Sequence, residues 1–216
     1  MDYKGKGQLV VFEGVDGSGK TTMVDNVVRA LEAMNIFPFK FRAPGGTKFG
    51  ENMRNTIFQS GTEPCNHAVA LAMMASHAQL IHEQLIPLLE GGAVVILDRF
   101  VESTLSYQGR DEASYALIKD LITKIVPKDL QYKTYILDIP IDVALQRINS
   151  RGVENFFDSK QVEFYAGNRE RLLTRMKELQ AQGQEVFFIR NNVPLEDSKQ
   201  IACTIAEQIS NSLFQK

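Results

Sequence analysis

The alternation of apolar and polar stretches along the chain predicts five β-strands separated by helices. Short runs rich in Val, Ile, Leu and Phe have the length and composition of buried strands. Longer stretches between them repeat apolar residues every three or four positions, which is typical of helices that cover a core. The expected strands span residues 8–13, 36–41, 93–98, 133–139 and 185–190, and the expected helices span 20–34, 66–90, 112–126, 141–151, about 160–182 and 196–214.

This order of elements predicts an α/β fold with a five-stranded parallel sheet and helices on both faces. No repeat or linker interrupts the pattern, so residues 1–216 are expected to form a single domain. Ligands of such sheets bind where the strands end at their carboxyl side. Asp16, Arg42, Asp98 and Arg99 follow or end the first three strands, and we expect them to share one crevice.

A phosphate-binding motif follows the first expected strand. Residues 14–21 read Gly-Val-Asp-Gly-Ser-Gly-Lys-Thr and match G-x-x-x-x-G-K-[ST] between a strand and a helix. Glycines let backbone amides converge on phosphate oxygens, and the helix N-terminus adds a favourable dipole. Lys20 is expected to reach the β- and γ-phosphates, and the Thr21 hydroxyl to hold Mg²⁺. The expected ATP-binding residues are Gly14, Val15, Asp16, Gly17, Ser18, Gly19, Lys20, Thr21 and Thr22.

Composition and charge limit the partners and the cellular compartment that we expect for this chain. The chain has a formal net charge of −2 and a pI of about 6.0, which argues against a nucleic acid polymer as partner. Its two cysteines, Cys65 and Cys203, lack the spacing of a metal site. The polar residues 1–7 contain no signal core, and no apolar run approaches the roughly 18 residues of a membrane span. We therefore expect a soluble, cytoplasmic protein without a membrane partner.

Residues at the ends of two further strands are candidates for binding phosphate groups or Mg²⁺. Asp98 is expected to orient water on Mg²⁺, and the planar fork of Arg99 to grip a second phosphate. An ion pair at the strand end is the alternative interpretation. Residues 42–47, Arg-Ala-Pro-Gly-Gly-Thr, form a glycine turn whose bare backbone could approach a ligand, although a plain loop remains an alternative.

These motifs resemble the thymidylate kinase family, most closely its bacterial-type branch, over about residues 8–210. The resemblance implies the P-loop nucleoside monophosphate kinase fold with a lid at about 150–163. It further implies transfer of the γ-phosphoryl group of ATP to dTMP, giving dTDP and ADP, with Mg²⁺ and as a homodimer. The matching positions are 12–22, Arg42, 44–47, Asp98, Arg99, Ser103, Thr104, 107–109, 135–138, Arg147 and 151–152.

The resemblance also implies roles around the acceptor nucleotide. Asp16 would accept a hydrogen bond from the sugar 3′-hydroxyl, and Arg99 would clamp the monophosphate with Arg42 and Arg54 as helpers. Tyr107 would pack under C2′ and exclude a ribose hydroxyl, while Thr104 and Gln108 would flank the base. The expected monophosphate site comprises Asp16, Arg42, Pro44, Arg54, Met73, His77, Arg99, Ser103, Thr104, Tyr107 and Gln108.

The arginine that stabilises the transferred phosphoryl group departs from the family pattern. The family usually supplies it from the P-loop or from an Asp-Arg-x-Glu element in the lid, where this chain has Gly17-Ser18 and Asn-Phe-Phe-Asp at 155–158. Arg147 and Arg151 are one helical turn apart, so both could point at ATP, or both could be solvated surface charges. The expected catalytic residues are Lys20, Asp16, Arg99, Arg147 and Arg151.

The expected helix 66–90 departs from the family at the base. The family commonly has a phenylalanine that stacks on thymine and, four residues on, an arginine that bonds its O4; this chain has Met73 and His77. Both residues could instead belong to the core. The base therefore stays open between thymine, uracil and 5-substituted uracils. Small and apolar residues along this helix suggest that it also packs against a neighbour, in line with a homodimer.

Three other functions compete with a dTMP kinase. A P-loop kinase of another small molecule would share residues 14–21, although Asp16 and the Tyr107-Gln108-Gly109 run favour a deoxypyrimidine nucleotide. A guanine-specific switch usually carries Asn-Lys-x-Asp, which this sequence lacks. A catalytically weak nucleotide-binding dimer would explain the missing lid arginine.

Overall fold

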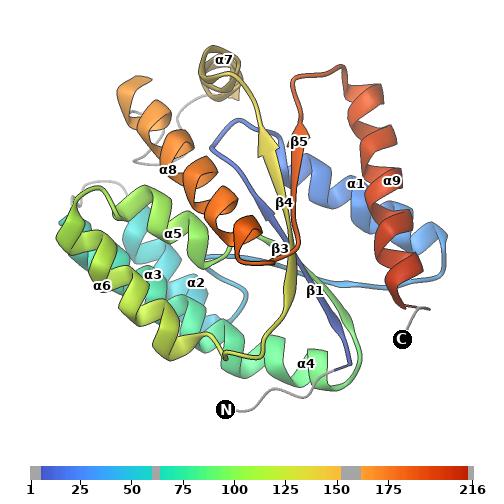
Figure 1. The fold of residues 1–216 in the computed structure, drawn as a ribbon, viewed down its shortest axis with the longest axis horizontal. Helices are drawn as coiled ribbons and strands as arrows, with labels where there is room; N and C mark the ends of the chain where they lie inside the picture. The colour runs from blue at the N-terminus through green and yellow to red at the C-terminus, as the bar shows by residue number, and fades with distance from the viewer. Residues whose placement is uncertain (1–5, 60–63, 152–161, 214–216) are drawn as a thin grey trace.

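A five-stranded parallel sheet forms the centre of the molecule (Figure 1). The computed structural model describes residues 6–59, 64–151 and 162–213, without the side chain of Arg151. The strand order is β2-β3-β1-β4-β5, and every neighbouring pair runs parallel, which confirms the predicted fold class. The strands are β1 (Gln8–Glu13), β2 (Phe39–Arg42), β3 (Val94–Asp98), β4 (Tyr132–Asp138) and β5 (Val186–Arg190).

Helices cover both faces of this sheet. Helices α1 and α9 lie on one side in Figure 1, and α3, α5, α6 and α8 lie on the other. The helical elements are α1 (Lys20–Ala33), α2 (Lys48–Phe58), α3 (Asn66–Leu80), η1 (Ile81–Leu85), α4 (Ile86–Glu90), α5 (Val101–Gln108), α6 (Glu112–Ile125), α7 (Ile141–Arg151), α8 (Val162–Ala181) and α9 (Leu195–Leu213).

The middle of strand β1, residues 9–12, is apolar because helices cover both faces of the sheet. Val10 and Phe12 pack with α1 and α9, whereas Leu9 and Val11 pack with the opposite helical layer. Successive side chains of a strand point to opposite faces, so a strand covered on both faces buries every position.

No helix in the described part of the chain has the length and apolar character that crossing a membrane requires.

The single helix predicted for 66–90 is divided in the structure. A π-helical segment, η1, separates α3 from α4. Pro87 lies just beyond η1 and has no backbone N–H with which to bond the carbonyl of Glu83. Proline and π-bulges are recognised causes of such irregularity in helices.

Two helices near the carboxyl edge of the sheet were not predicted. Every residue of α5 is buried, including polar ones such as Ser103 and Thr104, so the order of apolar and polar residues does not reveal the helical period. Helix α2 begins after the glycine turn, where the Thr47 hydroxyl accepts a hydrogen bond from the Gly50 amide at 2.9 Å.

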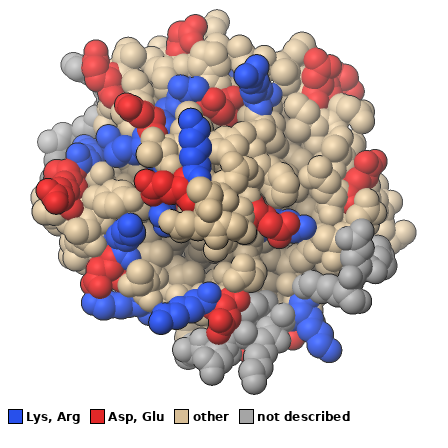
Figure 2. Space-filling view, in the orientation of Figure 1, with Lys and Arg blue, Asp and Glu red and all other residues tan. Residues whose placement is uncertain are grey.

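The sheet register brings the sequence motifs to one edge. Phe12 and Arg42 both pair with Asp98, so residues 14–21, 42–47 and 98–109 meet at the carboxyl ends of β1, β2 and β3. The predicted lid at 150–163 lies mostly outside the described residues. Figure 2 shows basic and acidic side chains interspersed over the face it presents, as the nearly balanced charge predicts.

Candidate functional site

The loop after β1 is shaped by left-handed glycines and a buried lysine. Gly17 and Gly19 have φ angles of 77° and 86°, which favour glycine. Lys20 is 6% exposed, and its ammonium donates to the Val15 carbonyl at 2.8 Å. Burial, with Arg99 nearby, lowers the pKa of Lys20 to about 8 although Asp16, Asp98 and Glu13 oppose the shift. This lysine is thus held inside the loop rather than in bulk solvent.

Helix α7 closes over the same loop. A Cβ atom on Gly17 would collide with the Ala144 carbonyl oxygen, so this position admits no side chain without movement of α7. One turn further along α7, Arg147 donates to the Gly17 carbonyl and to the Asn191 carbonyl, both at 3.3 Å. The guanidinium of Arg147 therefore lies beside Gly17, a position of the loop that has no space for a side chain of its own.

Asn191 is a part of this site that sequence reasoning missed. Its side-chain amide donates to the Ser18 carbonyl at 2.7 Å and accepts from the Ser198 hydroxyl at 3.0 Å. The residue follows the carboxyl end of β5, so the strand-end rule that selected Asp16 would also have found it.

Thr21 and Asp98 form the candidate metal site. The Thr21 hydroxyl donates to Asp98 Oδ2 at 2.8 Å. Among the described residues, no hydrogen-bond donor reaches the buried Oδ1 of Asp98. A hydroxyl and a carboxylate with an unused oxygen suit Mg²⁺, which is commonly held by one or two carboxylates together with substrate phosphates.

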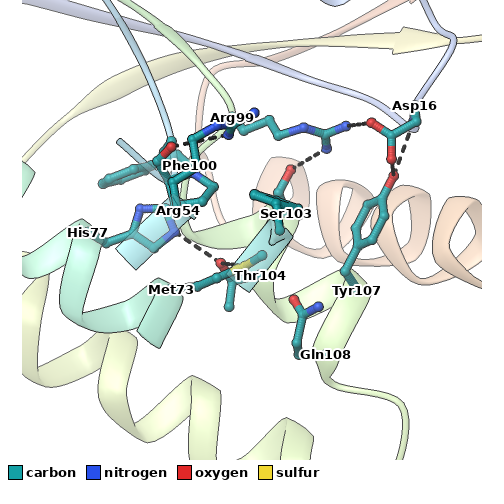
Figure 3. A pocket seen from close by; sticks show the side chains of 13 residues that line it. Asp16, Arg54, Met73, His77, Arg99, Phe100, Ser103, Thr104, Tyr107 and Gln108 are labelled. Atoms are coloured by element: carbon teal, nitrogen blue, oxygen red, sulfur yellow. Dashed lines mark hydrogen bonds and ion pairs between the residues drawn. The ribbon is translucent and has the colours of Figure 1, made fainter. Parts of the chain in front are cut away.

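Arg99 is fixed from several sides. Its guanidinium contacts Asp16 at 2.5 Å, the Gly14 carbonyl at 3.1 Å and the Ser103 hydroxyl at 3.0 Å (Figure 3). It also lies 5.3 Å from the centre of the Tyr107 ring, whose hydroxyl donates to Asp16 at 3.0 Å. Burial acts to lower the pKa of Arg99, but neighbouring anionic groups, Asp16 foremost, raise it above its usual value. Arg99 therefore stays charged.

Figure 3 shows the smaller of two neighbouring cavities, with a volume of about 100 Å³. Of the predicted monophosphate residues, all but Arg42 line it. Ala43, Phe58 and Phe100 were not among the predicted site residues; Phe58 ends helix α2 and Phe100 is the N-cap of α5. The lining comprises Asp16, Ala43, Pro44, Arg54, Phe58, Met73, His77, Arg99, Phe100, Ser103, Thr104, Tyr107 and Gln108.

One end of this cavity holds buried polar groups without charge. His77 Nε2 lies 3.0 Å from the Thr104 hydroxyl, which also contacts the Met73 sulfur at 3.7 Å. Burial lowers the pKa of His77 to about 4, so the imidazole is neutral at pH 7. His77 Nδ1 and both amide atoms of Gln108 are buried and have no hydrogen-bond partner among the described residues. Buried polar atoms of this kind favour a ligand with donors and acceptors.

A larger cavity of about 800 Å³ adjoins the first. Lys20, Thr21, Asp98 and Arg147 line it, and so does Arg42, whose guanidinium pairs with Glu51 at 3.0 Å. A third cavity of about 250 Å³ continues past Gly19 and Arg147 towards Asn191 and Leu195. The predicted residues thus divide between two adjoining spaces.

Comparison with known proteins shows the family of the chain. The family model described as "Thymidylate kinase" matches residues 12–201. A thymidylate kinase of Carboxydothermus hydrogenoformans is 36% identical over 172 residues, covering 78% of this chain and 83% of the relative. One from Rickettsia typhi is 34% identical over 166 residues (76% and 81%), and one from Psychrobacter sp. is 33% identical over 164 residues (74% and 78%). The chain belongs to the thymidylate kinase family.

Proposed function

We propose that this protein transfers the γ-phosphoryl group of ATP to dTMP and releases dTDP and ADP. The observation that carries this proposal is the junction of the two cavities, because Asp16, Arg54 and Arg99 line both. A donor in the larger cavity and an acceptor in the smaller one would meet at these side chains. Phosphoryl transfer depends on such positioning and on charge neutralisation rather than on a covalent nucleophile.

On the donor side, residues 14–22 would bind the phosphates of ATP, and the third cavity would accept the nucleoside. Lys20 would stabilise the charge that develops on the γ-phosphate. Thr21 and Asp98 would hold Mg²⁺, which when bound neutralises phosphate oxygens. Arg147 would supply the positive charge that the loop lacks at Gly17; Arg151 remains a second candidate whose side chain is not described.

On the acceptor side, Arg99 would bind the monophosphate, with Arg54 and Arg42 nearby. Arg54 is suited to this role because it is already anchored, donating to the Pro44 carbonyl at 3.2 Å and stacking 4.8 Å from the Phe58 ring centre. Asp16 and Tyr107 would contact the sugar, and Ser103 would hold Arg99. Met73, His77, Thr104 and Gln108 would surround the base.

The chemistry of the base pocket favours broad recognition of uracil derivatives as a second candidate specificity. Met73 is a flexible thioether that packs on a ring less specifically than an aromatic side chain. The neutral His77 offers one N–H donor where an arginine would offer several. We expect dUMP and 5-hydroxymethyl-dUMP to be used within about tenfold of dTMP. The double replacement Met73→Phe/His77→Arg should sharpen the preference for dTMP; a hundredfold preference in the unmodified enzyme, or no effect of the replacement, would contradict this specificity.

A cytoplasmic homodimer completes the proposal. Helix α3 exposes Leu71, at 49%, on a stripe with Ala68, Ala75 and Ala78. Small residues around an exposed leucine permit close packing of a second helix.

The activity is tested by coupling ADP release to the addition of dTMP, dUMP, 5-hydroxymethyl-dUMP, dCMP or dGMP. We expect turnover with dTMP and its 5-substituted relatives, and little with dGMP. Turnover with dGMP alone, or with none of the five, would overturn the proposal. Nucleotide binding without ADP release would identify the catalytically weak dimer instead.

A further inference from the structure

Glu13 ends strand β1 and has no exposed surface. One carboxylate oxygen accepts hydrogen bonds from the Phe100 amide at 2.8 Å and the Ser103 amide at 3.2 Å. The other oxygen accepts a short hydrogen bond from the Ser103 hydroxyl. Glu13 thus caps the first turn of α5 from a distant strand, and the nucleotide-binding roles above leave it unassigned.

Ser103 links this carboxylate to Arg99. The Ser103 oxygen accepts a hydrogen bond from the Arg99 guanidinium at 3.0 Å. A serine hydroxyl has a single proton, and a guanidinium can only donate. Because the proton of Ser103 is directed to Glu13, the lone pairs of its oxygen face Arg99. The carboxylate therefore sets the direction of this hydroxyl.

The neighbours of Glu13 in β1 and the following loop hold the rest of Arg99. Arg99 has a φ of 70°, an unfavourable backbone conformation for a residue other than glycine. Its amide donates to the Phe12 carbonyl at 2.9 Å, and its guanidinium donates to the Gly14 carbonyl at 3.1 Å. Such a conformation persists where surrounding contacts determine it, and these contacts come from both sides of Glu13.

We infer that Glu13 is a positioning residue for the acceptor phosphate, because through Ser103 it orients the Arg99 guanidinium. This inference rests on the proposed function for the identity of the acceptor. It adds a group that touches neither nucleotide and yet determines how firmly the monophosphate is held.

The pKa of Glu13 and its effect on stability distinguish a positioning role from a purely structural one. Burial raises the pKa of Glu13 to about 7, although Arg99, the hydrogen bonds from Ser103 and Phe100, and Lys20 oppose the shift. Among the described residues, Tyr132 on β4 is a further titratable group whose pKa the Glu13 charge raises. A carboxyl whose folded pKa is raised loses stability as pH rises from its unfolded value of about 4.5 to about 7. A glutamine would cap α5 without that loss, so a stability role alone does not explain a carboxylate.

The experiment compares Glu13→Gln, Ser103→Ala and the double variant with the unmodified enzyme. We expect Glu13→Gln to raise KM for dTMP at least tenfold, to leave KM for ATP within twofold, and to keep or raise Tm at pH 8. Ser103→Ala should raise KM for dTMP similarly, and the double variant should be no worse than either single variant, because both act through one path. Glu102→Gln, which disturbs a buried ion pair with Arg175 on the far side of α5, is the matched control and should leave both KM values unchanged.

The pH profile gives an independent readout. The kcat/KM of the unmodified enzyme for dTMP should fall as Glu13 becomes protonated near pH 7, and Glu13→Gln should lack this step. At still lower pH, kcat/KM of both enzymes should fall as the phosphate of the substrate is protonated, because its second pKa is about 6. Unchanged KM for dTMP in Glu13→Gln, equal rises for ATP and dTMP, or multiplied effects in the double variant would overturn the inference. If Glu13→Gln does not fold, the pH step decides: it should be present in the unmodified enzyme and absent from Ser103→Ala, and a step retained in Ser103→Ala would overturn the inference. If the unmodified enzyme rejects dTMP, the proposed function fails, and the same comparison is made with the monophosphate it accepts.

Discussion

At the scale of single residues, burial decides which side chains of the site carry charge. Arg99 remains a cation because Asp16 pairs with it, and His77 is neutral because burial disfavours its charged form. Lys20 lies between these cases, since burial lowers its pKa while carboxylates oppose the shift. Three predictions follow from these states of charge.

Lys20→Ala should lower kcat by at least 100-fold, because the ammonium is proposed to stabilise charge on the transferred phosphoryl group. Within the described residues, the Lys20 ammonium donates only to Val15 and Ser18 of the loop itself, so Tm should change little. Steady-state kinetics and thermal melts check both expectations. Near-full turnover in this variant would refute the assignment as a kinase.

Arg99→Ala should raise KM for dTMP about 30-fold, corresponding to the ~2 kcal/mol typical of hydrogen bonds to a charged group. KM for ATP should rise far less. Arg99→Lys keeps the charge but loses the planar fork, and should recover only part of the loss. Equal weakening of both nucleotides would contradict the division of the site into donor and acceptor cavities.

His77 should make folding sensitive to pH. Its folded pKa of about 4 is below the usual 6.5, so the unfolded chain binds more protons between these values. Stability from His77 is therefore complete above pH 6.5 and is lost as pH falls towards 4, by ~3 kcal/mol. The difference in unfolding free energy between the unmodified protein and His77→Gln, measured from pH 4 to 7, isolates this effect from the opposite trend of Glu13. A difference that does not vary with pH would show that folding leaves the pKa of His77 unchanged.

At the scale of elements, α7 lies so close to the loop at residues 14–21 that it limits which residues can place a side chain there. Ala144 leaves no space for a side chain at Gly17, and Arg147 contacts the Gly17 carbonyl from the next turn. The position of α7 thus determines which element can place an arginine at this loop.

Arg147→Ala should lower kcat about 100-fold and change KM for ATP less than tenfold, as expected for a contact that strengthens in the transition state. Arg29→Ala, an exposed arginine of α1, is the control for the loss of one positive charge. Retained kcat in Arg147→Ala and in the double variant with Arg151→Ala would mean that the charge comes from elsewhere.

At the scale of the whole molecule, the two helical layers differ in what they do. The layer containing α1 and α9 covers one face of the sheet and contributes Lys20 and Thr21 to the larger cavity. In the opposite layer, α3 and α5 line the smaller cavity, and α3 exposes Leu71. An interface on α3 would therefore lie directly behind Met73 and His77.

Leu71→Asp should weaken self-association at least tenfold, because it places a charge in the proposed apolar contact. Sedimentation velocity at several protein concentrations measures the change. Leu195→Asp alters an even more exposed leucine, 62% against 49%, at the start of α9 and should leave association unchanged. A monomeric unmodified protein, or a dimer insensitive to Leu71→Asp, would refute this interface.

The sequence by itself determined the sheet, most helices and the phosphate loop, because these depend on local pattern. Strand β1 and helix α7 match their expected bounds, since an apolar run or a 3.6-residue period is visible along the chain. Residues 14–21 also carry their chemistry locally, because glycines, a lysine and a threonine act within one turn. The strand-end rule grouped Asp16, Arg42, Asp98 and Arg99, and all four line the larger cavity because parallel strands end at one edge.

Only the tertiary structure decided what depends on distance across the fold. Helix α5 is buried on every side although most of its residues are polar, so its sequence has no apolar stripe from which a buried helix could be predicted. Phe58 reaches the acceptor cavity from α2, and Asn191 reaches Ser18 from beyond β5, across 173 positions of sequence. The charge of Glu13 and the neutrality of His77 follow from burial among residues that are distant in the chain. Such properties belong to the packed molecule, because a local sequence pattern specifies neither desolvation nor a long-range partner.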